Sequence, residues 1–177
     1  MLEHPHIVHT IEILEDPLAV YIVQELMSDG DLIDFLDKVK NESLAYTEAD
    51  AASIVHQLLM AVNYIHSTGI AHRDLKLDNI LVKLGPQSSD SFSLPSVVCK
   101  LTDFGLVTLI EKEGLRSSSL VGTPMYMSPE LISGSESYNA FASDIWAIGV
   151  IAYVLLTVNF PFGANEHSKQ GVFKSVM

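Results

Sequence analysis

Cysteine and basic side chains are scarce in this sequence of 177 residues. Its single cysteine, Cys99, excludes an internal disulfide and is typical of proteins in reducing compartments. Lys and Arg number 10 against 22 Asp and Glu, which gives a formal net charge of −12. Because no basic stripe is present to neutralise phosphates, nucleic acid is not expected as a partner. We therefore expect an intracellular protein of the cytoplasm, the nucleus or both.

Secretion signals and long apolar runs are also lacking. Residues 1–5 do not show the basic start and apolar run of a signal peptide. The longest apolar run, 145–158, is shorter than the roughly 20 residues that a membrane span needs, and Asp144 precedes it. We therefore expect no membrane partner. Because 48% of the residues are hydrophobic, the chain predicts a globular protein with one sizeable core.

The segment 70–82 carries the most informative polar residues. It contains an HRD triplet at 72–74, followed by Lys76 and Asn79, and a DFG triplet stands further on at 103–105. Alone, either triplet is more typical of an ordinary loop or turn. Apolar runs that predict strands lie beside both triplets, at 79–84 and 100–102. The polar residues are therefore expected on loops at strand ends, where catalytic groups are usually held.

Together with three downstream motifs, these residues resemble the eukaryotic protein kinases of the serine/threonine type. The downstream motifs are GTPMYMSPE at 122–130, DIWAIG at 144–149 and FPFG at 160–163. The resemblance implies Asp74 as the base that accepts the proton of the substrate hydroxyl, and Lys76 as the cation that faces the transferred phosphate. Thr123, taken with Lys76, is the pattern of kinases that act on serine and threonine rather than tyrosine.

The resemblance also implies ATP and Mg²⁺ as cofactors. Asn79 and Asp103 would supply oxygen ligands, which a hard cation prefers. The linker at 24–27, with Glu25 and Met27, would bind adenine through its backbone, above the apolar floor formed by Leu81. Asp31 would lie near the ribose. It is equally an acid that starts a helix, and both interpretations can hold.

Periodicity predicts the main elements. Strands are expected at 11–14 and 20–23, and a helix is expected from Asp31. Thr47 and Asp50 form a capping box before a helix with one apolar face, which Gly69 ends. A helix that opens at Asp144 is apolar nearly all round and is therefore expected to be buried. By the resemblance, Asp144 would accept hydrogen bonds from the backbone of the HRD turn.

Two serine-bearing segments leave alternatives open. The Ser- and Pro-rich segment 85–96 predicts an inserted surface loop, whose serines are either phosphorylated or part of a plain spacer. Ser119 aligns with the family's usual activating phosphosite, where a phosphate would pair with Arg73. The alternative is an ordinary exposed serine.

The implied fold is α+β, a truncated protein-kinase fold. Residues 1–27 would be the end of the β-rich small lobe and the hinge, and residues 28–177 the helical large lobe without its last helices. The family's glycine-rich phosphate loop has no counterpart here, since the sequence contains no G-x-G-x-x-G. Its small-lobe Lys and the Glu that pairs with it are missing as well. We therefore expect the chain alone to show negligible activity.

Two functions remain at this point. One is a serine/threonine protein kinase fragment that transfers the ATP γ-phosphate to protein hydroxyls with Asp74 as base. The other is an inactive remnant that acts as a binding or regulatory module. For the kinase, the expected partners are protein substrates with basic residues before the target. By the resemblance, Asp31 would favour Arg three residues before the target, and Asp78 would favour Arg two before less strongly because Val154 replaces a further acid.

Overall fold

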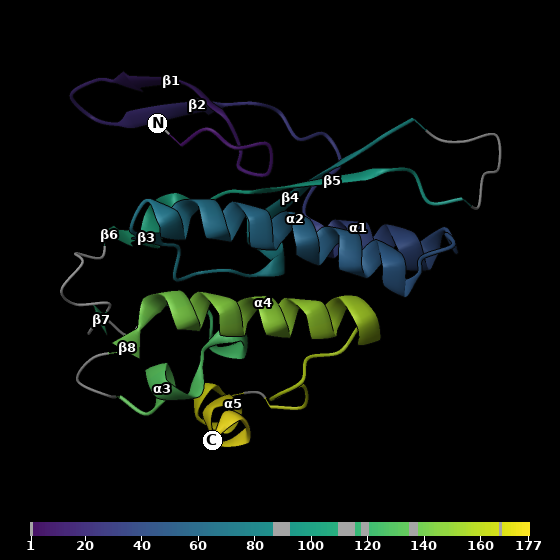
Figure 1. Ribbon diagram of the computed structural model, residues 1–177, viewed down its shortest axis with the longest axis vertical. Coiled ribbons are helices and arrows are strands. Elements are labelled where there is room, and N and C mark those ends of the chain that lie inside the picture. The colour runs from purple at the N-terminus through teal and green to yellow at the C-terminus, as the bar shows by residue number, and fades with distance from the viewer. Residues whose placement is uncertain (1, 87–92, 110–115, 118–120, 135–137, 167) are drawn as a thin grey trace.

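The computed structural model describes residues 2–86, 93–109, 116–117, 121–134, 138–166 and 168–177. At its centre two long helices, α2 (Glu48–Ser67) and α4 (Ala140–Thr157), lie side by side (Figure 1). Strands β4 (Ile80–Leu84) and β5 (Val97–Leu101) form an antiparallel pair that packs on α2. Their register joins Ile80 to Leu101, so the segments that follow the HRD triplet and precede the DFG triplet are adjacent.

The remaining elements are shorter. Helix α1 (Leu32–Asn41) packs against β4, and β1 (Thr10–Glu15) pairs with β2 (Val20–Gln24) in an antiparallel hairpin that projects from the body (Figure 1). Two-residue strands form two further antiparallel pairs, β3 (Ile70–Ala71) with β6 (Thr108–Leu109) and β7 (Arg116–Ser117) with β8 (Tyr138–Asn139). The last elements are α3 (Pro129–Ile132), α5 (Lys169–Val176) and 3₁₀ turns at Leu77–Asn79, Phe104–Leu106 and Pro124–Tyr126.

The predicted start and end of α2 are confirmed. The Asp50 carboxylate accepts from the Thr47 N–H at 2.8 Å, and the Thr47 hydroxyl accepts from the Asp50 N–H at 3.4 Å. These bonds satisfy N–H groups that have no partner inside the helix. The helix ends at Ser67, and Gly69 follows in the left-handed region with φ of 80°. Local sequence therefore sets both ends of the helix that precedes residues 72–79, the candidate catalytic loop.

The hydrophobic core lies between α2, α4 and the β4–β5 pair. Its largest fully buried apolar side chains come from all of these elements and from α1: Leu32, Phe35, Ile54, Ile65, Ile80, Leu101, Ile151 and Leu155. One buried amide also joins α2 to β5, because Gln57 donates to the Val97 carbonyl at 3.0 Å and accepts from the Cys99 N–H at 2.8 Å. The strand that leads to the DFG triplet is thus fixed to the central helix by packing and by hydrogen bonds.

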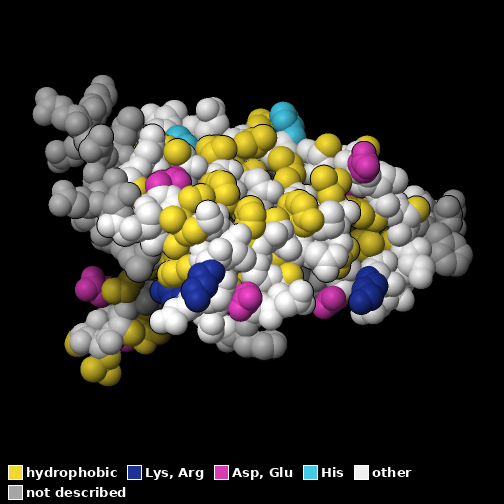
Figure 2. Space-filling model, turned by 90° about the horizontal axis from the view of Figure 1, so that it is seen from below, with side chains coloured by type: hydrophobic (Ala, Val, Ile, Leu, Met, Phe, Trp, Pro, Cys, Tyr) yellow, Lys and Arg dark blue, Asp and Glu magenta, His cyan; other side chains and the backbone are white. Residues whose placement is uncertain are grey.

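The expectation that the helix near Asp144 is buried all round is wrong for one side. The helix begins at Ala140, four residues before Asp144, and its exposed side carries Ile145, Tyr153 and Leu156, which are 49%, 44% and 56% exposed. Hydrophobic side chains are also widespread on the face seen from the side of α3 and α5 (Figure 2). By length and composition, α4 is the one helix among the described residues that could cross a membrane, although half of it is buried inside the fold.

Several boundaries differ from the sequence-based expectations. Asn79 belongs to a 3₁₀ turn rather than a strand, β5 begins at Val97, and Thr102 lies beyond its end. The final residues, which carry no clear periodicity, form α5 with Ser168 as its cap. At the base of the expected surface loop, the Gly85 N–H donates to the Ser96 carbonyl at 2.8 Å. Residues 87–92 of that loop lie outside the described residues.

Candidate active site

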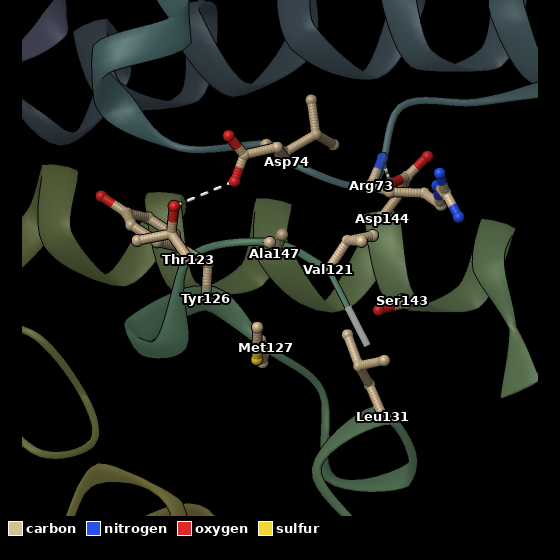
Figure 3. Close-up of a pocket in the computed structure, with 12 residues that line it drawn as sticks. Arg73, Asp74, Val121, Thr123, Tyr126, Met127, Leu131, Ser143, Asp144 and Ala147 are labelled. Carbon is tan, nitrogen blue, oxygen red and sulfur yellow. Dashed lines mark hydrogen bonds between the residues drawn. The ribbon is translucent and has the colours of Figure 1, made fainter. Parts of the chain in front are cut away.

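The Asp74 carboxylate is the point on which the predicted catalytic residues converge. One oxygen accepts from the Thr123 hydroxyl at 2.9 Å (Figure 3). The other lies 3.4 Å from the Lys76 ammonium and 3.3 Å from the Asn79 amide nitrogen. Asp74 and Lys76 are both partly exposed, whereas Asn79 is buried. The four side chains proposed from the sequence as catalytic therefore form one cluster that remains open to solvent.

Backbone bonds hold this cluster in shape. The Asn79 amide nitrogen also donates to the Asp74 carbonyl at 2.8 Å, which closes the loop across the 3₁₀ turn. On the other side, Gly122 approaches so closely that a Cβ there would lie 2.8 Å from the Arg73 carbonyl, and its φ is 113°. Both features require glycine at this position. The glycine brings its neighbour Thr123 into reach of Asp74.

Asp144 fixes the HRD turn from below, as the resemblance implied. Its carboxylate is 1% exposed and accepts from the His72 N–H at 2.9 Å and from the Arg73 N–H at 2.8 Å. The same carboxylate lies 2.8 Å from the His66 ring nitrogen, so His66 helps to hold Asp144 in position. Arg73 takes a left-handed φ of 67°, a conformation that costs about 1–2 kcal/mol for a residue other than glycine. The two hydrogen bonds to Asp144 hold this strained residue in place.

His72 connects the HRD and DFG segments. Its Nδ1 accepts from the Asp74 N–H at 3.3 Å, so Nε2 carries the proton and donates to the Thr102 carbonyl at 3.0 Å. The ring is fully buried and packs edge-on against Phe104 with centroids 5.1 Å apart. Burial lowers the pKa of His72 below its ordinary value, so the ring is neutral at physiological pH.

Asn79 and Asp103, the two predicted metal ligands, lie on adjacent segments. The Thr102 N–H donates to the Asn79 carbonyl at 3.0 Å, and Asp103 follows immediately. The Asp103 carboxylate is exposed, and one of its oxygens accepts from the Gly105 N–H at 3.2 Å. The Asn79 amide donates through its nitrogen, and its amide oxygen has no hydrogen-bond partner among the described residues. This set of neutral and anionic oxygens fits a hard cation such as Mg²⁺.

The residues predicted to bind the nucleotide lie on neighbouring backbone segments. Asp31 forms an isolated antiparallel bridge with Leu81, while the Glu25 N–H donates to His9 and the Glu25 carboxylate pairs with Lys100 at 2.6 Å. The Glu25 carbonyl and the Met27 N–H have no partner among the described residues. These are one acceptor and one donor of the kind that adenine requires.

Asp31 is the N-cap of α1. One of its carboxylate oxygens accepts from the Ile33 and Asp34 N–H groups at 2.8 and 3.0 Å, and Asp34 completes a capping box. The interpretation of Asp31 as a helix-starting acid is therefore confirmed. The second oxygen of its carboxylate has no partner among the described residues, so a role toward the ribose stays a prediction.

The segment after the DFG triplet contains the predicted phosphosite. Ser119, the candidate phosphosite, lies outside the described residues. The Arg73 side chain, its expected partner, donates from Nε to the Leu106 carbonyl at 2.7 Å. Glu130, within the 122–130 motif, is partly exposed and makes no ion pair within the described ranges. Partial exposure removes the large penalty that an unpaired buried charge would carry.

Sequence reasoning missed Gln57 and Tyr126. Tyr126 is buried beside Asp74, its hydroxyl accepts from the Leu77 N–H at 3.4 Å, and burial raises its pKa to about 12. No local sequence pattern indicates the structural role of either residue. A lone glutamine on a helix and a tyrosine within a turn motif gain their roles only from segments that are distant in the chain.

Comparison with known proteins gives a consistent result. The model of the protein kinase domain family matches residues 1–176. Serine/threonine-protein kinase 33 of Mus musculus is 37% identical over 172 residues, which cover 95% of this chain and 33% of the mouse protein. Serine/threonine-protein kinase DCLK1 of Rattus norvegicus is 36% identical over 176 residues, which cover 99% of this chain and 37% of the rat protein. The chain thus spans about a third of the length of these relatives.

Proposed function

This chain belongs to the protein kinase domain family, and we propose that it forms the catalytic centre of an enzyme that transfers the ATP γ-phosphate to serine or threonine hydroxyls of proteins. The observation that carries the proposal is the cluster around Asp74. Thr123, Lys76 and Asn79 all approach its carboxylate within 3.4 Å. Phosphoryl transfer depends mainly on positioning and on charge stabilisation, and this cluster is suited to both.

Each residue of the cluster has a defined task in this proposal. Asp74 accepts the proton of the substrate hydroxyl, because it is the carboxylate that the surrounding donors hold in a fixed direction. Thr123 orients one of its oxygens and Asn79 the other. Lys76, which lies 3.4 Å from Asp74 and is partly exposed, neutralises charge on the oxygens of the transferred group.

The cofactor proposal rests on the donor set. The family generally uses ATP and Mg²⁺, and we propose both for this protein, with Asn79 and Asp103 as the magnesium ligands. Bound magnesium would neutralise phosphate charge. Glu25 and Met27 would hold adenine through the unpaired carbonyl and N–H described above, with Leu81 beneath the ring and Asp31 close to the ribose.

Protein substrates with basic residues before the target serine or threonine are the proposed partners. The net charge of −12 favours a basic segment, and Asp31 and Asp78 are the acids assigned to it. Each exposed pair contributes about 0.2–1 kcal/mol, so preferences of a few-fold are expected. We also propose an intracellular location, in the cytoplasm or the nucleus. The alternative of an inactive binding module is not favoured, because the matched relatives are serine/threonine-protein kinases.

The test is transfer of labelled phosphate from ATP to a serine peptide by the protein in its full cellular length. Asp74→Asn should lower the rate at least about 100-fold, whereas Glu42→Gln, at an exposed carboxylate after α1, should not change it. Equal rates for Asp74→Asn and the unchanged protein would contradict the proposal. The 177 residues alone should transfer little, because they contain no G-x-G-x-x-G to position the phosphates.

A further inference from the structure

An ion pair ties the linker at 24–27 to the strand that leads to Asp103. The Lys100 ammonium lies 2.6 Å from one carboxylate oxygen of Glu25, and the same oxygen accepts from the His9 N–H at 2.7 Å. The side chains of Lys100 and Glu25 are only 18% and 29% exposed, so solvent screens this pair less than it screens a surface pair. Three segments that are distant in the sequence therefore meet at one carboxylate.

The Glu25 carboxylate is charged in this setting. Burial alone would raise its pKa, but the hydrogen bonds from the Lys100 ammonium and the His9 N–H outweigh burial and hold the pKa of Glu25 below its usual value. Hydrogen bonds between charged groups are shorter than those between neutral groups and about twice as strong. The contact thus restrains the direction of the Glu25 side chain, and with it the backbone that carries this side chain.

The linker itself has little other support. Leu26, between the two proposed adenine contacts, is 82% exposed. The hairpin before the linker projects from the body and exposes apolar side chains (Figure 1). After the linker, the Asp29 N–H donates to the Val82 carbonyl at 3.3 Å. Among the described residues, the ion pair is the one hydrogen-bonded contact between residues 24–27 and β5.

Lys100 is a firm point of attachment, because its two neighbours in β5, Cys99 and Leu101, are fully buried. The Cys99 N–H also donates to the Gln57 side chain of α2 at 2.8 Å. The register of the β4–β5 pair sets Lys100 opposite Leu81, the predicted apolar floor of the adenine site. Directly opposed side chains lie on the same face of a sheet, so Lys100 and Leu81 share one face. The linker is thus tied to the strand pair that carries this floor.

We propose that Lys100 is a positioning residue for adenine. Through Glu25 it holds the acceptor and the donor of the linker, the Glu25 carbonyl and the Met27 N–H, at a fixed place relative to Leu81. The inference rests on the proposed function, because that function supplies the identity of the ligand. It adds a residue that acts on nucleotide affinity through another side chain and not through contact with the nucleotide.

The test measures the binding of adenosine, which lacks phosphates, to the protein in its full cellular length. Lys100→Met should raise the Kd of adenosine about three- to tenfold, because the linker then holds the binding geometry only part of the time. The KM for ATP should rise by a similar factor, while kcat at saturating ATP should change less than about twofold. A residue that only supported the fold would lower Tm without this separation of KM from kcat.

Matched variants separate the ion pair from other effects. Lys100→Arg should keep the Kd of adenosine within about twofold, because arginine also pairs with a carboxylate. Lys83→Met is the control and should leave the Kd unchanged, because Lys83 is exposed on β4 and forms no ion pair within the described ranges. Glu25→Gln keeps an acceptor for the His9 N–H but removes the charge. It should therefore weaken binding as Lys100→Met does, and the double variant should bind no more weakly than Lys100→Met alone.

The restraint can also be measured without nucleotide. The His9 amide should exchange with solvent faster in Lys100→Met than in Lys83→Met, because the carboxylate that accepts its hydrogen bond is no longer held. The Leu101 amide, which donates to the His6 carbonyl, should exchange at the same rate in both variants.

Three outcomes would overturn the inference. Equal affinity of Lys100→Met and Lys83→Met for adenosine would do so. Equal losses of kcat and of adenosine affinity in Lys100→Met would make the pair a support of the fold as a whole. Tighter binding of adenosine by Lys100→Met would mean that the pair holds the linker away from its binding geometry. Adenosine binding with the expected order of variants, but without phosphate transfer, would instead contradict only the proposed function.

Discussion

The β1–β2 hairpin and the catalytic loop are both short backbone segments, yet the fold supports them very differently. In the hairpin all ten residues from 11 to 20 are exposed, and apolar side chains such as Ile13 and Ile22 are 58% and 60% exposed. In the catalytic loop His72 is fully buried, and two backbone N–H groups of the loop donate hydrogen bonds to the Asp144 carboxylate. The hairpin bonds mainly to itself, whereas the catalytic loop bonds to α4 through Asp144 and to Thr102 after β5.

The difference shows which part of the candidate site the chain pre-organises. The residues assigned to proton acceptance and charge stabilisation are held by α2, α4 and β5, so their geometry depends on the hydrophobic core. A two-stranded hairpin has little stability of its own in water. The hairpin that leads to Glu25 and Met27, the proposed adenine contacts, is therefore the less stable region.

Hydrogen exchange would test this comparison most directly. The amides of His72, Arg73 and Leu101 should open only with the core, whereas the paired amides of Leu14 and Tyr21 in the hairpin should open locally. Protection factors should differ at least about 1,000-fold, which corresponds to about 4 kcal/mol. Protection factors within tenfold of each other would mean that the hairpin and the core unfold as one unit.

Asp144→Asn should produce the next largest effect, because it damages the support of the catalytic loop. The asparagine side chain keeps one acceptor oxygen for the two backbone N–H donors of His72 and Arg73. Its NH₂ group would therefore face one of these donors in a buried site. We expect the free energy of unfolding to fall by about 2–4 kcal/mol in urea denaturation. The exposed variant Glu48→Gln is the control and should change it by less than about 0.5 kcal/mol. A similar small change for Asp144→Asn would show that the loop is held by other contacts.

The buried His72 ring predicts how the stability of this region depends on pH. Because burial lowers the folded pKa below the value of 6.5 in the unfolded chain, the unfolded state binds more protons as pH falls. The free energy of unfolding should therefore fall below about pH 6.5, by up to about 1.4 kcal/mol per pH unit. Thr102, Asp144, Asp74 and Asp103 surround the ring and limit the shift.

Denaturation of the unchanged protein and of His72→Gln across pH 5–7.5 isolates this contribution. In His72→Gln the free energy of unfolding should depend less steeply on pH than in the unchanged protein, even if the variant is less stable at every pH. His4, whose pKa is also lowered by burial, provides the comparison near the hairpin end. Its ring is only partly buried, so His4→Gln should change the slope less than His72→Gln does. A larger change in this slope for His4→Gln than for His72→Gln would mean that His72 is not the main source of the pH dependence.

Asp103→Asn should have the smallest effect on the fold. The carboxylate is exposed, and its one hydrogen bond among the described residues is to the Gly105 N–H, which an amide oxygen can also accept. Asparagine tolerates the left-handed φ of 58° as well. Tm should stay within about 1 °C, while phosphate transfer by the full-length protein should be lost. A large loss of stability without ligand would make Asp103 a structural residue.

Much of the catalytic cluster could be predicted from the sequence because its residues are close in the chain or fall in specific motifs. Asp74, Lys76 and Asn79 lie within six residues of one another, and the role of Asp144 followed from the family resemblance. The capping box at Thr47 is likewise a local pattern. Local geometry and motif spacing are enough for such features.

Other features could not be predicted, because they depend on the distance between segments. Nothing in the sequence indicates that Gln57 reaches β5 or that one side of α4 stays exposed. Uniform hydrophobicity conceals which face of a helix has a neighbour. The left-handed turn at Val158 is equally invisible, since valine is a residue that usually avoids it. The cavity that Thr123 lines together with Leu77 and Val154 therefore emerges only from the assembled fold.

The segment before β1 is joined to the strand before Asp103 by a pair of backbone bonds. The Val8 N–H donates to the Leu101 carbonyl and the Leu101 N–H donates to the His6 carbonyl, both at 2.9 Å. A ribosome adds about 5–20 residues per second, so Leu101 emerges roughly 5–20 s after Ile7. During that interval the apolar Ile7, which is 2% exposed in the finished fold, has no strand to cover it. Nascent chains stalled between these two residues should therefore be bound by chaperones that recognise exposed apolar segments.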